Sequence, residues 1–295
     1  MSGYDRLMAR IANGERILID GATGTEIERR GVPQLDNAWN GGGALSHPDV
    51  LRSVHEEYIR EGAEIVISNT FATHRHALRD AGVEHQFEAY NRRGVELAIE
   101  ARDRMQAADV LVAGGISYWS WSGNWPAPED LTASTEEEAS IMAEAGADLL
   151  MLEMMVDIER LVVTLEAAQT SDLPVWVGLS CKPDESGVVN LLRGGTLADA
   201  LEAISDRNVL LVNIMHTEVE HIDACLDVVQ DCWPGPTGVY AHSARWANNV
   251  CYFDVTVSPQ DYASHAKEWL ERGVQVIGGC CGMGVDHIGA LKTLV

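Results

Sequence analysis

Two adjacent cysteines, Cys280 and Cys281, lie near the end of the chain in the stretch GGCCGMGVDHI, directly after an apolar run. Adjacent cysteines rarely form a disulfide with each other, because the small ring strains the peptide bond between them. They can instead turn two thiolates toward one metal ion, and sulfur ligands suit zinc. Because a zinc site takes at least three protein ligands, the pair predicts a metal centre whose third ligand comes from elsewhere in the chain.

The apolar run before the cysteines is the last of eight, most of them rich in isoleucine and valine. They span residues 16–20, 64–68, 110–114, 148–153, 174–180, 208–213, 237–241 and 275–278. Continuous apolar runs of this length are typical of strands buried on both faces, as in a parallel sheet. Segments with helical periodicity lie between them, among them 48–61 and 84–106.

This alternation of strands and helices, repeated eight times, predicts a (β/α)8 TIM barrel of the α/β class. A doubly wound open sheet is the alternative. No internal repeat, low-complexity stretch or linker rich in proline and serine divides the sequence, so we expect one catalytic domain over residues 1–295.

The ends of the predicted strands carry the residues of most interest, because a barrel places its chemistry at the C-terminal ends of its strands. The residue at or just beyond each end is polar or able to bind a metal in nearly every case: Asp20, Asn69, Ser117, Glu153, Cys181, Asn213, His242, and Cys280 with Cys281. We therefore expect these side chains to meet at one rim of the barrel.

Composition excludes several classes of partner. The net charge of -24 argues against nucleic acid and against anionic membranes, since both demand a basic surface. The sequence has no apolar span of the length that crosses a bilayer, and its start, MSGYDRLMAR, lacks the layout of a signal peptide. Six cysteines in such a chain suggest reduced thiols. We expect a soluble, acidic, cytoplasmic protein.

Several of these motifs, in this order, resemble the homocysteine S-methyltransferase family. They are the glycine-rich turn from Leu18 to Glu26, Asn69-Thr70-Phe71, Glu153, Asn213, Tyr240-Ala241-His242-Ser243 and the glycine-flanked cysteine pair. The resemblance spans essentially the whole chain. It implies a (β/α)8 barrel enzyme of methionine biosynthesis that moves a methyl group from an onium donor or methylfolate to homocysteine bound on zinc. Methylfolate is the less expected donor, because one domain leaves no room for cobalamin and folate modules.

The same resemblance suggests roles for the predicted site residues. We expect Asp20 and Glu153 to be catalytic acids suited to the substrate ammonium. Backbone N–H groups in the turn from Gly21 to Thr25 suit a substrate carboxylate. The full set of predicted substrate-binding residues is Gly21, Thr25, Asn69, Trp119, Trp121, Asn213 and Tyr240.

The third zinc ligand is where the sequence departs from the family. The family cysteine directly follows the asparagine that ends strand six, and here that position is Ile214, which cannot bind metal. Three side chains are candidates to replace it: His216, His242 and Cys181. The absence of any zinc site is a fourth possibility.

A second departure follows strand seven, where Arg245 stands in place of a family glutamate. If this loop faces the substrate, the reversed charge implies a ligand of different charge.

The third departure is an aromatic stretch after strand three, from Ile116 to Trp125, with three tryptophans and one tyrosine. Sulfonium and quaternary ammonium ions bind over aromatic faces, each contact contributing about 0.5–2 kcal/mol. Trp119 and Trp121 are therefore predicted to bind the donor. Alternatively, these rings cap the barrel or line an interface between copies of the chain, so a homo-oligomer stays open.

The leading hypothesis is a zinc-dependent S-methyltransferase that takes a small-molecule onium donor and a thiol acceptor. A second hypothesis keeps the onium pocket but changes the acceptor or the reaction, to a demethylase or a lyase. A third is a non-catalytic binder of methylated cations.

Overall fold

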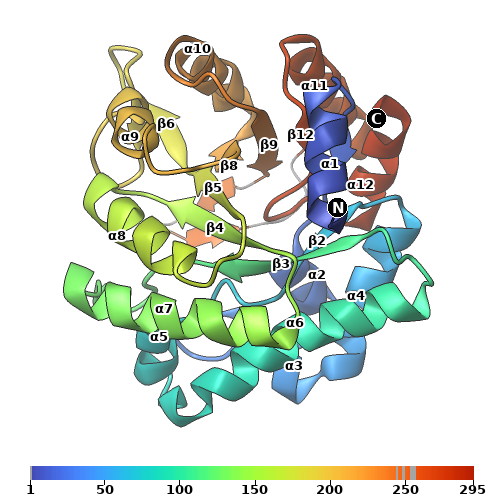
Figure 1. Cartoon of the computed structure of the whole chain (residues 1–295), viewed down its shortest axis with the longest axis vertical. Helices are drawn as coiled ribbons and strands as arrows, with labels where there is room; N and C mark the ends of the chain where they lie inside the picture. Colours follow the sequence, from blue (N-terminus) through green and yellow to red (C-terminus); the bar gives the residue numbers. More distant parts are fainter. Residues whose placement is uncertain (1, 244, 248–249, 253–256) are drawn as a thin grey trace.

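Eight parallel strands form the centre of the molecule (Figure 1). The computed structural model describes residues 2–243, 245–247, 250–252 and 257–295, with the backbone alone for 245–247 and 250–252. The central strands are β1 (Ile17–Leu18), β2 (Ile65–Ile67), β3 (Leu111–Ile116), β4 (Leu149–Met155), β5 (Val175–Leu179), β8 (Val212–Glu218), β9 (Thr237–His242) and β12 (Val276–Ile277). Every predicted run overlaps one of them.

The order of the strands closes the sheet into a barrel. Neighbours run β1-β12-β9-β8-β5-β4-β3-β2, and an isolated parallel bridge between Ile19 and Ile65 brings the two end strands together. The predicted (β/α)8 barrel is therefore confirmed, and the open-sheet alternative is wrong because the sheet has no free ends.

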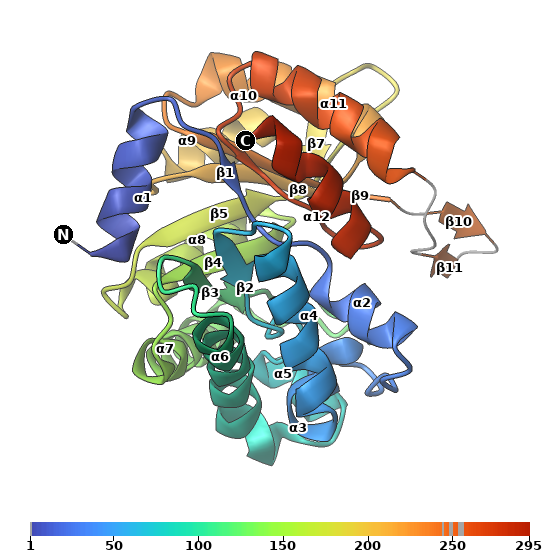
Figure 2. The same cartoon turned by 90° about the vertical axis from the view of Figure 1, so that its right-hand side faces the viewer.

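Helices surround the barrel (Figures 1 and 2). They are α1 (Gly3–Ala12), α2 (Thr23–Arg29), α3 (Gly43–Ser46), α4 (Pro48–Arg60), α5 (Arg75–Asp80), α6 (Phe87–Arg104), α7 (Pro128–Ala145), α8 (Ile158–Gln169), α9 (Leu197–Ile204), α10 (Ile222–Cys232), α11 (Pro259–Glu271) and α12 (Val285–Leu291). Proline at the first position starts α4, α7 and α11, where its missing N–H costs no helical hydrogen bond.

Helix α1 packs at the N-terminal end of the barrel. The indole Nε1 of Trp176, at the start of β5, donates a hydrogen bond of 2.9 Å to the hydroxyl of Tyr4, and both side chains are buried. The opposite end of the barrel is the one left for a site.

Strand six of the barrel, β8, differs from the prediction. It begins at Val212 and continues five residues beyond Asn213, to Glu218. Its pairing with β9 shifts register between Met215 and Glu218, and His216 there has a φ of +43°. Such a left-handed conformation is uncommon for a residue other than glycine. Bulges of this kind re-aim side chains at barrel rims.

A matching irregularity lies in β4, two strands away. The pairing with β5 shifts register between Leu152 and Met155, and Met154 has a φ of +57°. The two bulges touch, because the backbone N–H of Met154 lies 3.1 Å from the sulfur of Met215.

Two antiparallel hairpins follow barrel strands. One, β6 (Cys181–Pro183) with β7 (Val189–Leu191), follows β5, and the other, β10 (Arg245–Ala247) with β11 (Val250–Tyr252), follows β9. The second extends away from the barrel wall (Figure 2).

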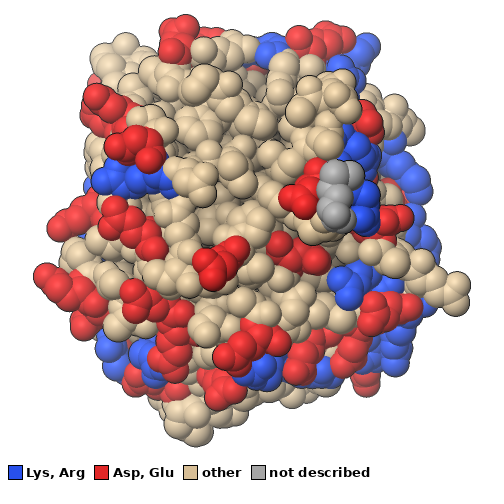
Figure 3. Space-filling view, in the orientation of Figure 1, with Lys and Arg blue, Asp and Glu red and all other residues tan. Residues whose placement is uncertain are grey.

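Charged side chains are interspersed around the edge of the face seen in Figure 3. Many basic groups pair with acids, as when Arg30 contacts Glu26 at 3.1 Å and Glu57 at 2.8 Å. Such pairing leaves the acidic excess to set the surface charge. Among the described helices, none is long and apolar enough to cross a membrane.

Candidate metal centre and substrate cavity

A cavity of about 930 Å³ opens at the C-terminal ends of the barrel strands. Most of the predicted site residues line it: Asp20, Gly21, Thr25, Asn69, Trp119, Trp121, Glu153, His216, Tyr240, His242, Cys280 and Cys281. Asn213, Ser117 and Cys181 are not among its lining residues. The structure thus brings together residues spread over almost the whole chain.

Asn213 does not reach the cavity. Its side chain is completely buried, with its amide 3.5 Å from the sulfur of Met151 and its oxygen packed against Gly238. The prediction took this residue for the strand end, whereas β8 continues for five more residues. Asn213 therefore lies inside the barrel, below the rim.

Three side chains at the rim have the arrangement of a metal centre. The ligand atoms of His216, Cys280 and Cys281 lie within 4.8 Å of one another. The Cys280 sulfur is 3.6 Å from Nδ1 of His216 and 3.9 Å from the Cys281 sulfur. Around tetrahedral zinc, ordinary bond lengths place two sulfurs about 3.8 Å apart and a sulfur and a nitrogen about 3.6 Å apart. The residues present therefore fit zinc.

Cys181 does not take part in this cluster. It is completely buried in β6, where burial and the neighbouring Cys225 raise the pKa of its thiol. Cys225 belongs to α10, so Cys181 packs toward the helical layer. The suggestion that Cys181 replaces the missing family cysteine is wrong.

Ile214 packs in the barrel wall and does not reach the cavity. It is completely buried and pairs with Leu179 of β5 and Val239 of β9. The strand instead presents His216 two residues later. Burial, followed by the neighbouring His242, lowers the pKa of His216 well below its ordinary value. The neutral imidazole favoured in this way is the form that binds a metal.

His242 lies beside the cluster rather than in it. Its ring meets the His216 ring edge to face, with centroids 4.3 Å apart and planes at 84°. Its Nε2 is 3.9 Å from a carboxylate oxygen of Glu218.

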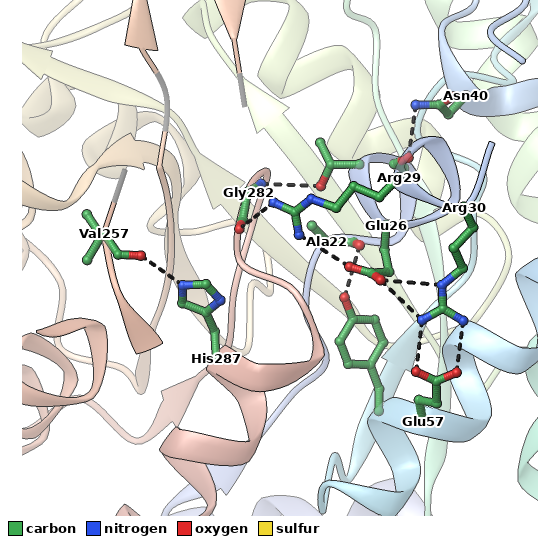
Figure 4. A network of polar contacts seen from close by, with 12 residues as sticks. Ala22, Glu26, Arg29, Arg30, Asn40, Glu57, Val257, Gly282 and His287 are labelled. Atoms are coloured by element: carbon green, nitrogen blue, oxygen red, sulfur yellow. Dashed lines mark hydrogen bonds and ion pairs between the residues drawn. The ribbon is translucent and has the colours of Figure 1, made fainter. Parts of the chain in front are cut away.

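The turn that carries the cysteine pair is held from two sides, and Figure 4 shows the contact of Arg29 with Gly282 on one of them. The N–H of Gly282 donates to the Thr25 hydroxyl at 3.2 Å, and Arg29 donates to the Gly282 carbonyl at 3.2 Å. On the other side, the N–H of Cys280 donates to the carbonyl of Ala241 at 2.9 Å. Thr25, predicted to bind substrate, thus also anchors the metal-binding turn.

Gly282 is required by the geometry of this turn. Its φ is +85°, and a Cβ there would lie 2.6 Å from the carbonyl oxygen of Ser243. Both the backbone conformation and the close approach exclude a side chain.

Two buried acids form part of the cavity wall. The carboxylate of Asp20 accepts a hydrogen bond of 2.8 Å from the N–H of Ile67, and burial raises the pKa of Asp20 well above its ordinary value. Burial also raises the pKa of Glu153, to about 8. A cationic group entering the cavity would favour the ionised form of both.

The aromatic residues form two clusters. Trp39, Phe71 and Trp121 have ring centroids 5.8 to 6.4 Å apart, and Trp119 meets Trp125 edge to face at 5.2 Å. At these separations the rings of a cluster contact one another. They therefore offer the cavity flat aromatic walls, with no room for a cation between the rings of one cluster.

In the part of the chain that the structure describes, the cavity has four charged lining residues that the sequence analysis missed: Glu28, Arg29, Lys182 and Glu218. Glu218 ends the observed strand β8, and its interaction with His242 lowers its pKa to about 2. Lys182, one of three lysines in the chain, follows β5 and also lines the cavity. Drawing strand six to its true end would have found Glu218. The side chain of Arg245 lies outside the described residues.

A parallel barrel with buried acids, aromatic walls and a Cys-Cys-His cluster at its C-terminal rim is the arrangement of a barrel enzyme with a candidate metal centre. The chain belongs to the homocysteine S-methyltransferase family, whose model matches residues 17–295. The predicted resemblance is confirmed, and with it an enzyme that transfers a methyl group to a thiol.

Individual relatives are distant but align over almost their full length. The homocysteine S-methyltransferase of Escherichia coli (strain K12) is 26% identical over 314 residues, covering 99% of each chain. The selenocysteine methyltransferase of Astragalus bisulcatus is 26% identical over 331 residues, covering 96% of this chain and 93% of its own. The metallated form of the homocysteine methyltransferase MmuM from Escherichia coli shares the fold, with a TM-score of 0.80, 24% identity and coverage of 97% and 99%.

Proposed function

We propose that this enzyme transfers a methyl group from an onium donor to the thiol of homocysteine, with zinc held by Cys280, Cys281 and His216. The observation that carries the proposal is the spacing of the three ligand atoms, all within 4.8 Å of one another at the rim of the cavity. Relatives named for homocysteine and selenocysteine support an amino acid with a sulfur or selenium nucleophile as acceptor.

The ligand set gives this centre an unusual charge for the family. Zinc, when bound, supplies a positive charge that keeps a thiol acceptor deprotonated near neutral pH. Two cysteine thiolates and a neutral His216 balance that charge, whereas the three cysteines implied by the family pattern would leave an excess negative charge. The proposed ligands therefore favour binding of an anionic thiolate.

The amino-acid end of the acceptor has matching groups in the cavity wall. We assign its ammonium to Asp20 and Glu153, because both buried acids line the cavity. We assign its carboxylate to N–H groups of the turn from Gly21 to Thr25 other than that of Ala22, which donates to the carbonyl of Met283 at 3.0 Å. Among the described residues, the hydroxyl of Tyr240 has no hydrogen-bond partner although it is buried, so we assign it to a polar group of the substrate.

The donor lies against the aromatic walls in this proposal. Trp119 and Trp121 line the cavity, and their ring faces attract a methylated cation. The net charge of -24 adds a long-range attraction for cations. Transfer then requires the leaving group, the methyl carbon and the acceptor sulfur to be in line, which the barrel loops fix by holding both substrates.

Methylation of homocysteine gives methionine, so the enzyme belongs to methionine formation in this proposal. Its reactive thiols need a reducing compartment, which favours the cytoplasm.

The test combines metal analysis with product mass. Elemental mass spectrometry of the purified chain should find about one zinc per chain, lost in the Cys280→Ala/Cys281→Ala variant. Incubation with homocysteine and a sulfonium or betaine-type donor should give a product of the mass of methionine, with the wild type only. A chain without zinc, or a variant with unchanged turnover, would overturn the proposal.

A further inference from the structure

Two polar residues near His216, His242 and Glu218, do not belong to the proposed ligand set: the His242 ring packs on the His216 ring, and Glu218 contacts His242. We propose that Glu218 and His242 are positioning residues that hold the His216 ring in the orientation in which it binds metal. This inference rests on the proposed zinc centre and assigns a task to residues that do not touch the metal.

The backbone explains why His216 needs such support. At φ +43° it lies in the bulge of β8, between the register positions Met215 and Glu218. A residue in a bulge is left out of the regular ladder of hydrogen bonds. The sheet therefore does not by itself fix the direction of the His216 side chain.

The neighbouring ring limits how His216 can turn. Nδ1 of His216 lies 3.6 Å from the Cys280 sulfur. The His242 ring packs against the His216 ring, with the two planes at 84° and the centroids 4.3 Å apart. Rotation of the imidazole about its bond to Cβ would carry Nδ1 away from the sulfur and drive the ring into His242. His242 is only 5% exposed, so most of its ring surface is packed against neighbouring residues.

His242 is itself held in place. It pairs directly with Glu218 across the strands β8 and β9, and its Nε2 lies 3.9 Å from Oε2 of that residue. The same oxygen is 3.3 Å from Nδ1 of His221, which fixes the carboxylate from its other side. Contacts thus run from His221 through Glu218 and His242 to His216.

Groups that orient a metal ligand contribute measurably to metal affinity. Loss of such an outer partner costs about 10- to 100-fold in metal affinity. Here the partner acts through packing on the His216 ring, so its removal should widen the range of ring orientations and weaken zinc binding without removing a ligand.

The test is the zinc affinity of the full-length protein, measured by competition with a chelator. His242→Ala and Glu218→Gln should each weaken zinc binding about 10- to 100-fold. Two controls, Glu220→Gln and His85→Ala, change an exposed acid and an exposed histidine and should stay within about twofold of wild type. Thermal unfolding of each metal-free variant checks that the fold is kept.

Two further measurements separate positioning from general loosening. Because both residues act along one line of contacts, the double variant Glu218→Gln/His242→Ala should be no weaker in zinc affinity than His242→Ala alone. His242→Phe keeps a ring in place but loses the contact with Glu218, so Glu218→Gln should have little further effect in that background. Cobalt bound in place of zinc should show altered absorption bands in the single variants.

The outcomes are distinguishable. A wild-type chain that binds no zinc overturns the metal centre and this inference together. A wild type that binds one zinc, with single variants of unchanged affinity, overturns the positioning role alone and leaves the proposed function standing.

Discussion

Acceptor binding should depend on pH through Glu153. Burial raises the pKa of this carboxyl to about 8 in the empty cavity, and only its ionised form attracts an ammonium. About half of the molecules carry the ionised form at pH 8, about one in eleven at pH 7 and about one in a hundred at pH 6. Affinity for the amino-acid end should therefore fall about 5-fold from pH 8 to pH 7, and about 9-fold more to pH 6.

Methionine is the ligand of choice for this measurement. As the proposed product it has the same ammonium and carboxylate as homocysteine, yet it has no thiol whose own ionisation would add to the pH dependence. Its dissociation constant, measured by calorimetry from pH 6 to pH 8, should follow the titration of Glu153. In Glu153→Gln the affinity should be lower and its pH dependence shallower, because glutamine imitates the protonated acid and leaves only the contribution of Asp20, whose pKa is also raised by burial.

The control is Glu159→Gln, which changes an exposed glutamate six residues further along and should keep the wild-type slope. A flat profile in the wild type would refute the reasoning, as would a Glu153→Gln variant with the slope intact. The first result would mean that Glu153 does not receive the ammonium, and the second that another group titrates.

Three other perturbations have defined outcomes. Burial lowers the pKa of His55 to about 4, so the contribution of His55 to folding stability is complete above pH 6.5 and is lost as the pH falls toward 4. Denaturant unfolding should show that the free energy of unfolding falls by about 2 kcal/mol between pH 7.5 and pH 5. The variant His55→Leu should lack this decrease. Gly282→Ala should lose its zinc, by elemental analysis, and about 1–3 kcal/mol of stability through backbone strain; normal zinc content would contradict the account of the turn. Trp119→Ala should raise the KM for the donor about 2- to 30-fold and leave that of the acceptor unchanged, in steady-state kinetics.

The barrel was predictable because its strands are buried on both faces. Such burial leaves continuous apolar runs, and eight of them, separated by helical segments, allow few other folds. The end of strand six was not predictable in the same way. A polar Asn213 is a normal sign of a strand end, and the bulge that carries the strand on to Glu218 depends on a backbone conformation at His216 that no residue pattern announces.

Part of the candidate site was predictable from the sequence, and the third ligand was not. Cys280, Cys281 and Asp20 follow strands whose ends the sequence placed well, and Glu153 lies in β4 two residues before its end; all four line the cavity as expected. For the third ligand the sequence offered three candidates, Cys181, His216 and His242, each at or just beyond a predicted strand end. Their order along the chain does not distinguish them, whereas the packing turns Cys181 toward α10 and brings His216 close to both cysteines.

The anchoring of the cysteine turn on Thr25 has a thermodynamic consequence. Thr25 belongs to the turn assigned to the substrate carboxylate, and its hydroxyl also fixes the N–H of Gly282 beside the proposed ligands. Two sites that share an anchor are coupled, and coupling free energy is reciprocal. If bound zinc raises the affinity for the acceptor by some factor, then bound acceptor must raise the affinity for zinc by the same factor, through slower dissociation or faster association of the metal. In a cell short of zinc, the enzyme molecules with acceptor bound would then retain the metal best.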